Sequence, residues 1–382
     1  MSDMTTLSVT LHNAIADIGR DAWDAVRPDA NPFTSYDFLH ALEASRSVSA
    51  RSGWQATHLA LRDGDTVTGV MPLYVKSHSM GEYVFDHAWA RAYEEAGGDY
   101  YPKLLSAVPF TPVTGARLLA RDAAARRALV EAAVKVCDGN RLSSLHVNFP
   151  AEDDWRTLGD CGLLLRQDQQ FWFDNPGYAS FDDFLAQLSS NRRKVIRRER
   201  RDVQALLDFR IVTGSDITER HLDDMYAFIA DTYARKWGTG KPYLTRAFFS
   251  EVAKTMRDRI VLVFAHEAGR AVAGAINFTG DGVLYGRQWG ALVDVPFLHF
   301  EVCYYQAIDY AIANGLKRVE AGTQGEHKLS RGYLPNPVYS AHYIRDARLR
   351  RPVADYLARE RQAVAESMAE LEAEASPFKK GG

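Results

Sequence analysis

The sequence predicts an α/β fold built from two similar halves. Two segments, 56–74 (ATHLALRDGDTVTGVMPLY) and 260–278 (IVLVFAHEAGRAVAGAINF), each contain an apolar strand, a short turn with glycine and a second strand. This order is typical of a β-hairpin. Downstream of each hairpin a helix-like segment runs into a further strand, so the order strand, strand, helix, strand occurs twice.

The helix of each half is indicated by apolar residues spaced three and four apart. These helical segments lie within 124–149 (AARRALVEAAVKVCDGNRLSSLHVNF) and 300–323 (FEVCYYQAIDYAIANGLKRVEAGT). Each contains an adjacent glycine and asparagine, 139–140 and 314–315, which are natural helix stops. A strand follows in both halves, and the repeated order favours an internal structural repeat.

The length of 382 residues fits two domains of ordinary size. A break rich in Pro, Gly and Asn at 174–178 separates the two halves. We therefore predict an N-terminal domain over 1–170 and a C-terminal domain over 171–350. The remaining segment, 351–382, contains a charged helix and then a tail that we expect to be flexible.

The composition is that of a soluble globular protein, with 46% hydrophobic and 25% charged residues. The net charge of −3 excludes a global basic field, so any polyanion site must be local. The three isolated cysteines lack the spacing of a structural zinc site and suit a reducing compartment. We find no secretory signal and no apolar run long enough to span a membrane, so we expect a cytoplasmic protein.

The segment 76–104 (KSHSMGEYVFDHAWARAYEEAGGDYYPKL) concentrates polar and aromatic residues. Packing of an amphipathic helix explains the aromatic residues, but polar side chains at this density are costly to bury without partners. Two acids and a histidine have helical spacing, yet no established metal motif forms. As candidate substrate-binding residues we therefore take His78, Glu82, Asp86, Tyr101 and Lys103.

A turn bounded by proline and glycine, 109–115, leads through Arg117 into the first predicted helix. A glycine at a helix entrance exposes backbone N–H groups to an anion, and the helix dipole adds to the attraction. Gly115 and Arg117 are therefore candidate donor or phosphate-binding residues. The alternative is an ordinary turn between a strand and a helix, and the spacing matches neither the dinucleotide fingerprint nor the P-loop.

The segment 189–202 (SSNRRKVIRRERRD) is strongly basic. Seven of the eleven residues from 191 to 201 are Lys or Arg, and Glu199 is the only acid among them. Apolar residues at helical spacing predict one packed helix with a basic face. That face is either simply solvated or contacts polyphosphate or RNA, for which Arg192, Arg193 and Arg197 are candidates.

Two further groups of residues suit ligand binding. Trp237 lies in an aromatic and cationic loop, ARKWGTGKPY, which suits stacking on a base or sugar, or else anchors the core. In the segment 283–312, Arg287 and Trp289 occupy alternate positions of a predicted strand and so lie on one face, and a helix that carries His299 near its start follows after a short loop. The next strand ends in the loop VEAGTQGEHKLSRGYLP, so two strand ends with polar residues are predicted to form a cleft.

Six strings together resemble the FemAB-like family of predicted N-acyltransferases, which belongs to the GNAT superfamily. They are NPFTSYDFLHALE, HSMGEYVFDHAW, YYPKL, PFTPVTGARLL, RKWG and EAGTQGEHKLSRGYLP, and the resemblance spans about residues 31–361. It implies two tandem GNAT-like domains, each a mixed, mostly antiparallel sheet flanked by helices. It also implies a basic segment that opens the second domain and a strand that ends in Glu320-Ala321-Gly322.

Relatives of this type use aminoacyl-tRNA to aminoacylate a cell-wall peptide linked to a lipid or a nucleotide. The acyl-CoA loop usual in GNAT enzymes has only a degenerate counterpart here, because 112–119 (PVTGARLL) contains one glycine. The resemblance therefore leaves two donors, acyl-CoA or aminoacyl-tRNA, as co-substrates and implies no tightly bound cofactor. The acceptor is an amine, for which a cell-wall precursor is the candidate, and tRNA is a candidate partner.

Transfer of an acyl group to an amine needs a base for the ammonium proton and donors for the oxyanion. The candidate catalytic residues are Glu320, Glu326, His327 and Lys328, while Arg287 and Arg331 could hold a carboxylate or phosphate. The alternative is a non-catalytic module that recognises a peptidoglycan precursor or RNA. A zinc hydrolase is a third option, and the oligomeric state does not follow from the sequence.

Overall fold

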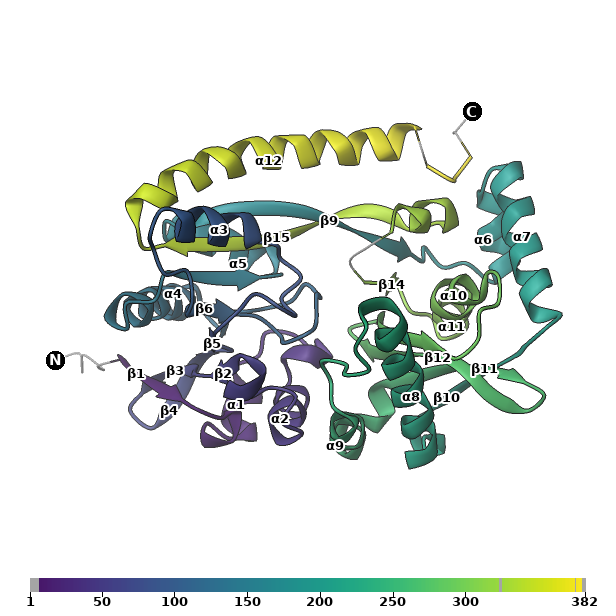
Figure 1. The fold of residues 1–382 in the computed structure, drawn as a ribbon, viewed down its shortest axis with the longest axis horizontal. Coiled ribbons are helices and arrows are strands. Elements are labelled where there is room, and N and C mark those ends of the chain that lie inside the picture. Colours follow the sequence, from purple (N-terminus) through teal and green to yellow (C-terminus); the bar gives the residue numbers. More distant parts are fainter. Residues whose placement is uncertain (1–6, 323–324, 375, 380–382) are drawn as a thin grey trace. The chain divides into compact units, whose positions relative to one another are not determined.

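The computed structural model describes residues 7–322, 325–374 and 376–379, without the side chains of Glu326 and Glu374. The chain forms two compact units (Figure 1). Unit 1 consists of Met1–Asp168 and Pro337–Ala365, and unit 2 consists of Gln169–Asn336 and Glu366–Gly382. Both units are therefore discontinuous in sequence, whereas the sequence analysis expected the continuous ranges 1–170 and 171–350.

Unit 1 contains two groups of strands. The first has the order β1-β3-β4-β7 and is antiparallel throughout. The second has the order β2-β5-β6-β8-β15, in which β6 and β8 are parallel and the other pairs described are antiparallel. The strands are β1 (Leu7–His12), β2 (Trp54–Ala56), β3 (His58–Asp63), β4 (Thr66–Met71), β5 (Tyr74–Lys76), β6 (Lys103–Ser106), β7 (Leu119–Ala120), β8 (Ser144–Asn148) and β15 (Leu334–Ile344).

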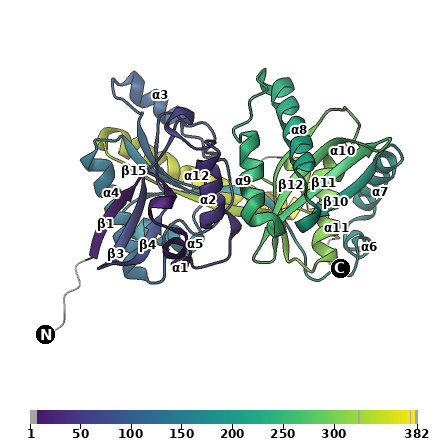
Figure 2. The ribbon, with the colours of Figure 1, turned by 90° about the horizontal axis from the view of Figure 1, so that it is seen from below.

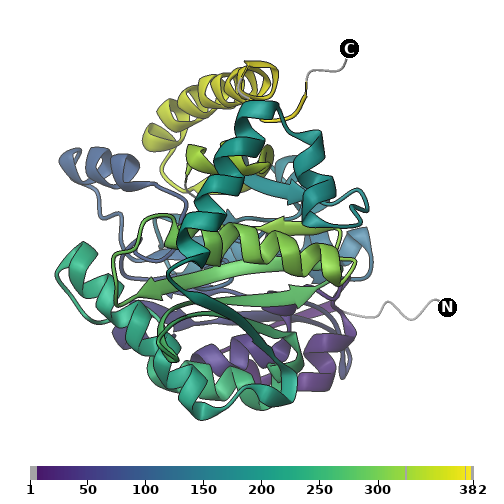
Figure 3. The same cartoon turned by 90° about the vertical axis from the view of Figure 1, so that its right-hand side faces the viewer.

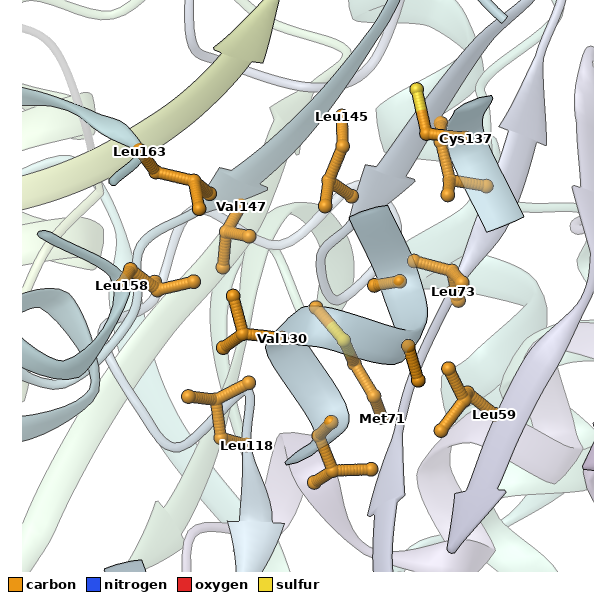
Figure 4. Packing of buried hydrophobic residues seen from close by; sticks show 14 of the residues in the cluster. Leu59, Met71, Leu73, Leu118, Val130, Cys137, Leu145, Val147, Leu158 and Leu163 are labelled. Carbon is orange, nitrogen blue, oxygen red and sulfur yellow. The ribbon is translucent and has the colours of Figure 1, made fainter. Parts of the chain in front are cut away.

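The main core of unit 1 lies between its strands and the helix α4 (Figure 4). Leu129 and Val130 of α4 pack with Leu145 and Val147 of β8, and all four side chains are fully buried. Asp122 caps this helix, because its side chain accepts a hydrogen bond from the N–H of Ala125. The helices are α1 (Arg20–Ala25), α2 (Tyr36–Ala44), α3 (His87–Glu95), α4 (Ala123–Gly139) and α5 (Glu152–Asp160), with 3-10 turns η1 (Ile15–Asp17), η2 (Pro32–Thr34) and η3 (Ala50–Ser52).

Unit 2 is built on a mixed sheet with the order β10-β11-β12-β13-β14-β9. Its pairs are antiparallel except for β13 and β14, which are parallel. The strands are β9 (Leu164–Asp174), β10 (Asp208–Thr213), β11 (Ile260–Glu267), β12 (Arg270–Gly280), β13 (Val283–Ala291) and β14 (Arg318–Glu320).

Helices cover both faces of the unit 2 sheet (Figure 2). On one face α8 packs directly on β12 and β13, where Gly274 and Gly290 leave room for it. The other face carries α10, η6 and α11 (Figure 3). The helices of unit 2 are α6 (Phe181–Gln187), α7 (Ser190–Gln204), α8 (Glu219–Trp237), α9 (Arg246–Met256), α10 (Leu298–Phe300), the π-helix η6 (Glu301–Tyr305) and α11 (Gln306–Ala313), with 3-10 segments η4 (Gly214–Asp216), η5 (Arg257–Arg259) and η7 (Glu326–Arg331). The last helix, α12 (Ala347–Glu374), belongs to unit 1 up to Ala365.

The predicted α/β fold, with mixed, mostly antiparallel sheets flanked by helices, is confirmed. Both hairpins form, β3 with β4 and β11 with β12. At the turn of the second hairpin Ala268 and Gly269 have φ values of 48° and 80°, as a type I′ turn requires. In each unit one parallel strand pair is joined by a helix, α4 in unit 1 and α10–α11 in unit 2.

The limits of the units differ from the predicted domains because of the last strand and the helix after it. Ser340–Ile344 of β15 pair with β8, and Val353 and Leu357 of α12 pack with Trp89 and Tyr100. These contacts place 337–365 in unit 1. Among the described helices, none combines the length and the apolar character that a membrane span requires.

Candidate functional site

The parallel strands β13 and β14 part at the place where the sequence predicted a cleft. They pair from Val283 with Arg318 to Tyr285 with Glu320, where β14 ends, while β13 continues to Ala291. Gly286 is the first residue past this pairing, and a Cβ added to it would lie 3.4 Å from the carbonyl oxygen of Glu320. An opening therefore begins between the backbone at Gly286 and the segment that follows Glu320.

A β-bulge adds to this opening on the side of β12. Ile276 pairs with Gln288, and Asn277 pairs with Gly286, so β13 gains one residue at Arg287. A bulge bends its strand and redirects the side chains around it. The parting of the strands and the bulge fall on the same residues, 286–288.

The resulting cavity lies within unit 2 and has an empty volume of about 400 Å³. Strands β12 and β13 form one wall, and α10 with the π-helix η6 forms the other. π-Helices are rare in proteins, and those that occur are often found at functional sites. The lining residues are Ala275, Asn277, Gly286, Arg287, Gln288, Trp289, His299, Cys303, Tyr304, Ala321 and Gly322.

Three predicted binding residues therefore lie in this one cavity, Arg287, Trp289 and His299. The ring of His299 lies 4.5 Å from that of Trp289, measured between centroids. Burial lowers the pKa of His299 to about 4, and the charges of Lys328 and Arg331 act in the same direction. The imidazole is therefore neutral at pH 7 and serves as a hydrogen-bonding group.

Tyr304, which was not among the residues predicted from the sequence, joins the cavity to the loop that follows β14. Its hydroxyl lies 2.9 Å from Nε2 of His327. Burial raises the pKa of Tyr304 and lowers that of His327, so at pH 7 the phenol keeps its proton and the imidazole is neutral. Tyr304 lies five residues after His299, which is not the three- or four-residue spacing of an α-helical face, so the sequence contained no signal for it.

Lys328 is buried against the rim of the cavity. Its Nζ donates a hydrogen bond of 2.7 Å to the carbonyl oxygen of Gly322, and burial lowers its pKa to about 8. A fraction of this amine is therefore neutral at physiological pH. Lys328 also anchors η7, because it connects that segment to the end of β14.

Arg331 does not face the cavity as an empty anion site. Its Nη2 donates to both carboxylate oxygens of Glu199, at 2.9 and 3.0 Å, and its Nε donates to the hydroxyl of Tyr305 at 3.0 Å. Its Nη1 donates to the carbonyl oxygen of His327 at 2.8 Å. The carboxylate that Arg331 binds is therefore that of Glu199 and not that of a substrate. Arg331 serves to position η7.

Glu199 was not among the site residues predicted from the sequence, although the sequence carries a signal for it. Glu199 shares the inward spacing of Ile196 and Val203, and all three side chains are buried. An acid at a core position of an otherwise basic helix indicates a buried cationic partner. That partner is Arg331.

Glu320 lies on the other face of the sheet from the cavity. Its neighbour Val319 points into the core with α11, so Glu320 shares the opposite face with Trp172, its partner on β9. Burial raises the pKa of Glu320 to about 7, against the lowering by Arg318 and Arg287. Its Oε2 has no hydrogen-bond partner among the described residues. The side chain of Glu326 lies outside the described part of the chain.

In unit 1 the structure brings four predicted residues together in a buried network. Nζ of Lys103 donates to Glu82 at 2.8 Å, to Asp86 at 2.5 Å and to Ser79 at 2.7 Å. Ser79 in turn is hydrogen-bonded to Tyr101 at 2.8 Å. A second lysine, Lys76, opposes Lys103 in the strand pairing, and burial lowers its pKa to about 7. His78 lies apart, where its Nδ1 accepts from the N–H of Met80.

The network continues across the sheet of unit 1. Tyr100 donates to Asp86 at 2.7 Å and lies 3.2 Å from Nε2 of His146, whose Nδ1 is 2.7 Å from Nδ1 of His342. Burial lowers the pKa of both histidines, that of His146 to about 3. Burial would raise the pKa of Asp86, but Lys103 and His146 hold it below its usual range. The chain of hydrogen bonds therefore contains neutral imidazoles and ionised groups side by side.

Gly115 and Arg117 do not form the expected anion site at a helix entrance. Helix α4 begins only at Ala123, so Gly115 does not lie at its N-terminus. The guanidinium of Arg117 is buried and donates to four backbone carbonyls, those of Val113, Gly115, Ala116 and Asn148. The N–H groups of residues 117 and 118 donate to the carboxylate of Asp154. The anion held here is therefore the protein's own side chain.

The basic segment forms one helix with an outward basic face, as the apolar spacing predicted. On α7, Arg197 pairs with Asp182 at 2.8 Å, while Arg192 and Arg193 form no ion pair with a described residue. Trp237 does not anchor the core, because 56% of its side chain is exposed. Among the described residues, no group of three or more His, Cys, Asp or Glu side chains could hold a metal ion.

A family model described as peptidoglycan biosynthesis/recognition matches residues 14–380. The chain belongs to the FemAB-like family. This confirms the resemblance inferred from the sequence. No curated protein matches this sequence.

Solved structures with this fold are only distantly related in sequence. FemX aligns over 91% of this chain and 100% of its own, with a TM-score of 0.53 and 11% identity. The C-terminal domain of a putative lysylphosphatidylglycerol synthetase from Agrobacterium fabrum aligns over 96% and 100%, with a TM-score of 0.54 and 9% identity. L-PGS from Bacillus licheniformis aligns over 87% and 97%, with a TM-score of 0.50 and 9% identity. At these identities the likeness shows a shared fold.

Proposed function

We propose that the protein is an N-acyltransferase of the FemAB-like family that uses the cavity of unit 2 for transfer to an amine. The donor is an activated acyl or aminoacyl group, as in acyl-CoA or aminoacyl-tRNA. The acceptor is an amine of a cell-wall precursor, and the reaction takes place in the cytoplasm. The family description and the fold shared with FemX support this class of reaction.

The observation that carries the proposal is the parting of β13 and β14 beside Tyr304 and His299. The opening exposes peptide groups of two strands to one cavity, and a narrow chain with amide or ester groups can lie along such edges. The two polar side chains then face the reacting carbonyl from the opposite wall. Concave sites of this kind, with few polar groups, are the usual ligand sites of enzymes.

The chemistry requires one proton to leave the acceptor and one to reach the leaving group. The amine nitrogen forms a bond to the acyl carbon, and the bond from that carbon to sulfur or oxygen of the donor breaks. His327, neutral and exposed, is suited to take the ammonium proton. The hydroxyl of Tyr304, which keeps its proton, is suited to donate to the leaving group and is connected to His327.

The test is a mass-spectrometric screen for transferred mass, with panels of acyl-CoA, charged tRNA and amines. Once a pair reacts, Tyr304→Phe should lower turnover by about 10²- to 10⁴-fold, the usual contribution of a proton donor. Tyr310→Phe is the matched control, because Tyr310 lies on α11 and does not line the cavity. Equal turnover of wild type and Tyr304→Phe would exclude Tyr304 as the donor.

His327→Ala and Glu326→Gln extend the same assay to η7. Loss of turnover with an unchanged unfolding curve would identify either residue as part of the machinery. The family description also names recognition, which supports a binding module as the second candidate function. Tight binding of a precursor without any transferred mass would favour that candidate over catalysis.

A further inference from the structure

Trp237, the last residue of α8, leaves 56% of its side chain exposed. The other six tryptophans are buried or half-buried. An indole in water loses the stabilisation of about 1.5–3 kcal/mol that burial gives a large apolar side chain. An exposed tryptophan is therefore a candidate for contact with a ligand or partner.

The indole of Trp237 is held by a second aromatic ring. Tyr233, one helical turn earlier, meets it edge to face with ring centroids 4.4 Å apart and an interplanar angle of 72°. Tyr243 lies 6.0 Å from Tyr233 and is itself 36% exposed. The edge contact with Tyr233 supports the indole, and a base would stack on the ring in place of the Lys236 ammonium that lies over it.

This platform, the ring of Trp237, is connected to the end of β13, a strand that lines the cavity of unit 2 on the face of the sheet opposite α8. The guanidinium of Arg235 donates to the carbonyl oxygen of Ala291, and the N–H of Ala291 donates to Oγ1 of Thr232 at 3.3 Å. These bonds connect the end of α8 to the end of β13, two residues after Trp289, which lines the cavity. The charge of Lys236 also contributes to the lowered pKa of His299, after burial and the nearer cations.

The charges around the platform favour an anionic ligand. Lys236 and Lys241 are exposed, and neither forms an ion pair with a described residue. Nζ of Lys236 lies 5.2 Å from the centroid of the Trp237 ring. A neutral sugar could stack on an indole without any cation, whereas a phosphorylated nucleoside uses both the ring and the ammonium groups.

We propose that Trp237 stacks the base of a phosphorylated nucleoside at the end of α8, with Lys236 and Lys241 facing its phosphate. Binding of the nucleotide is inferred from the residues of α8 and the loop after it. Only the identity of the molecule that supplies the nucleotide rests on the proposed function. Both donor classes carry a phosphorylated adenosine, and a nucleotide-linked acceptor carries a phosphorylated nucleoside. The site would hold that nucleoside while the reacting group enters the cavity.

Binding can be measured without any transfer reaction. Titration with AMP or UMP should quench tryptophan fluorescence, because Trp237 is the most exposed indole. Trp237→Ala should weaken binding by about 5- to 150-fold, the range for loss of one stacked base. Trp237→Phe should bind more tightly than Trp237→Ala. Trp155→Phe is the control, because Trp155 stacks on Tyr339 in unit 1.

Further variants and ligands measure the contribution of the lysine charge and distinguish acyl-CoA from tRNA as the source of the nucleotide. Lys236→Gln should weaken AMP binding and reduce its salt dependence. CoA binding more tightly than the trinucleotide CCA would identify an acyl-CoA donor, and the reverse order would identify the tRNA end. Quenching by N-acetylglucosamine but not by AMP or UMP would overturn the proposal, as would equal affinity of wild type and Trp237→Ala. If nucleotides bind but no mass is transferred, the proposed function fails and this inference stands.

Discussion

Arg331 and Glu199 join the basic helix to the segment that carries His327 and Lys328. Nη2 of Arg331 lies 2.9 and 3.0 Å from the two carboxylate oxygens of Glu199, and both side chains are more than 90% buried. Tyr305 donates to the same carboxylate. Helix α7 is therefore more than a solvated basic surface, because its one inward acid determines where η7 lies.

Replacing Glu199 by Gln should strongly destabilise unit 2. The change leaves Arg331 with a buried positive charge, and breaking a buried pair in this way costs about 3–5 kcal/mol. Urea unfolding would measure the loss. Asp182→Asn, which removes the exposed partner of Arg197, serves as the control. A free energy of unfolding within about 0.5 kcal/mol of wild type would show that Arg331 finds another partner.

Gly290→Ala should separate α8 from the sheet. A Cβ at Gly290 would lie 2.2 Å from the carbonyl carbon and oxygen of Phe228, and neither atom can move without the helix backbone. Overpacking of this kind costs about 1–3 kcal/mol or more. Gly139→Ala is the matched control, because nothing lies within 4 Å of its Cβ position. Thermal unfolding of both variants should show a large loss for the first and none for the second.

The stability contributed by Glu320 should fall as pH rises. Burial raises its pKa to about 7, whereas the unfolded chain has a pKa of about 4.3. The folded state thus binds more protons between these values, and the free energy of unfolding decreases with pH across that window by at most about 1.4 kcal/mol per pH unit. Glu320→Gln should remove this component. The variant's stability relative to wild type should therefore be higher at pH 8 than at pH 5, and an equal difference at both pH values would contradict the assignment.

Arg117→Met should destabilise unit 1 without weakening anion binding. Burial lowers the pKa of Arg117 to about 10, so its guanidinium is still charged at pH 7 when it holds the carbonyls around it. Each buried polar group left without a partner costs about 1–3 kcal/mol. Arg127→Met, which removes an exposed pair with Asp160, is the control. Weaker binding of phosphate to Arg117→Met at unchanged stability would restore the sequence-based role.

Patterns confined to one segment predicted the local elements correctly. The Asp-Gly and Ala-Gly turns indicated both hairpins, and the apolar spacing within 189–202 indicated α7. The two strand ends predicted an opening at Arg287 and Trp289, because neighbouring strands bring their ends together. These inferences needed only periodicity and turn chemistry.

The sequence did not reveal partners that lie far apart along the chain. Whether Arg331 meets a substrate or Glu199 depends on packing between segments 132 residues apart. Arg117 has the composition of an anion site, but its donors are used by carbonyls that the fold brings around it. The register of β15 with β8 likewise moved 337–365 into unit 1. The pattern of residues within one segment carries no information on which distant segments will contact it.

Because residues 337–365 belong to unit 1, this unit cannot complete its folding on the ribosome until most of unit 2 has been synthesised. His146 of β8 meets His342 of β15, 196 residues later. At a synthesis rate of about 5–20 residues per second, β8 waits roughly 10–40 s for its neighbour, while most of unit 2 emerges in between. During that interval the edge of β8 that carries His146 is unpaired, and a chaperone or a neighbouring nascent chain could reach it. Ribosomes stalled before residue 337 should therefore hold an unfinished first unit.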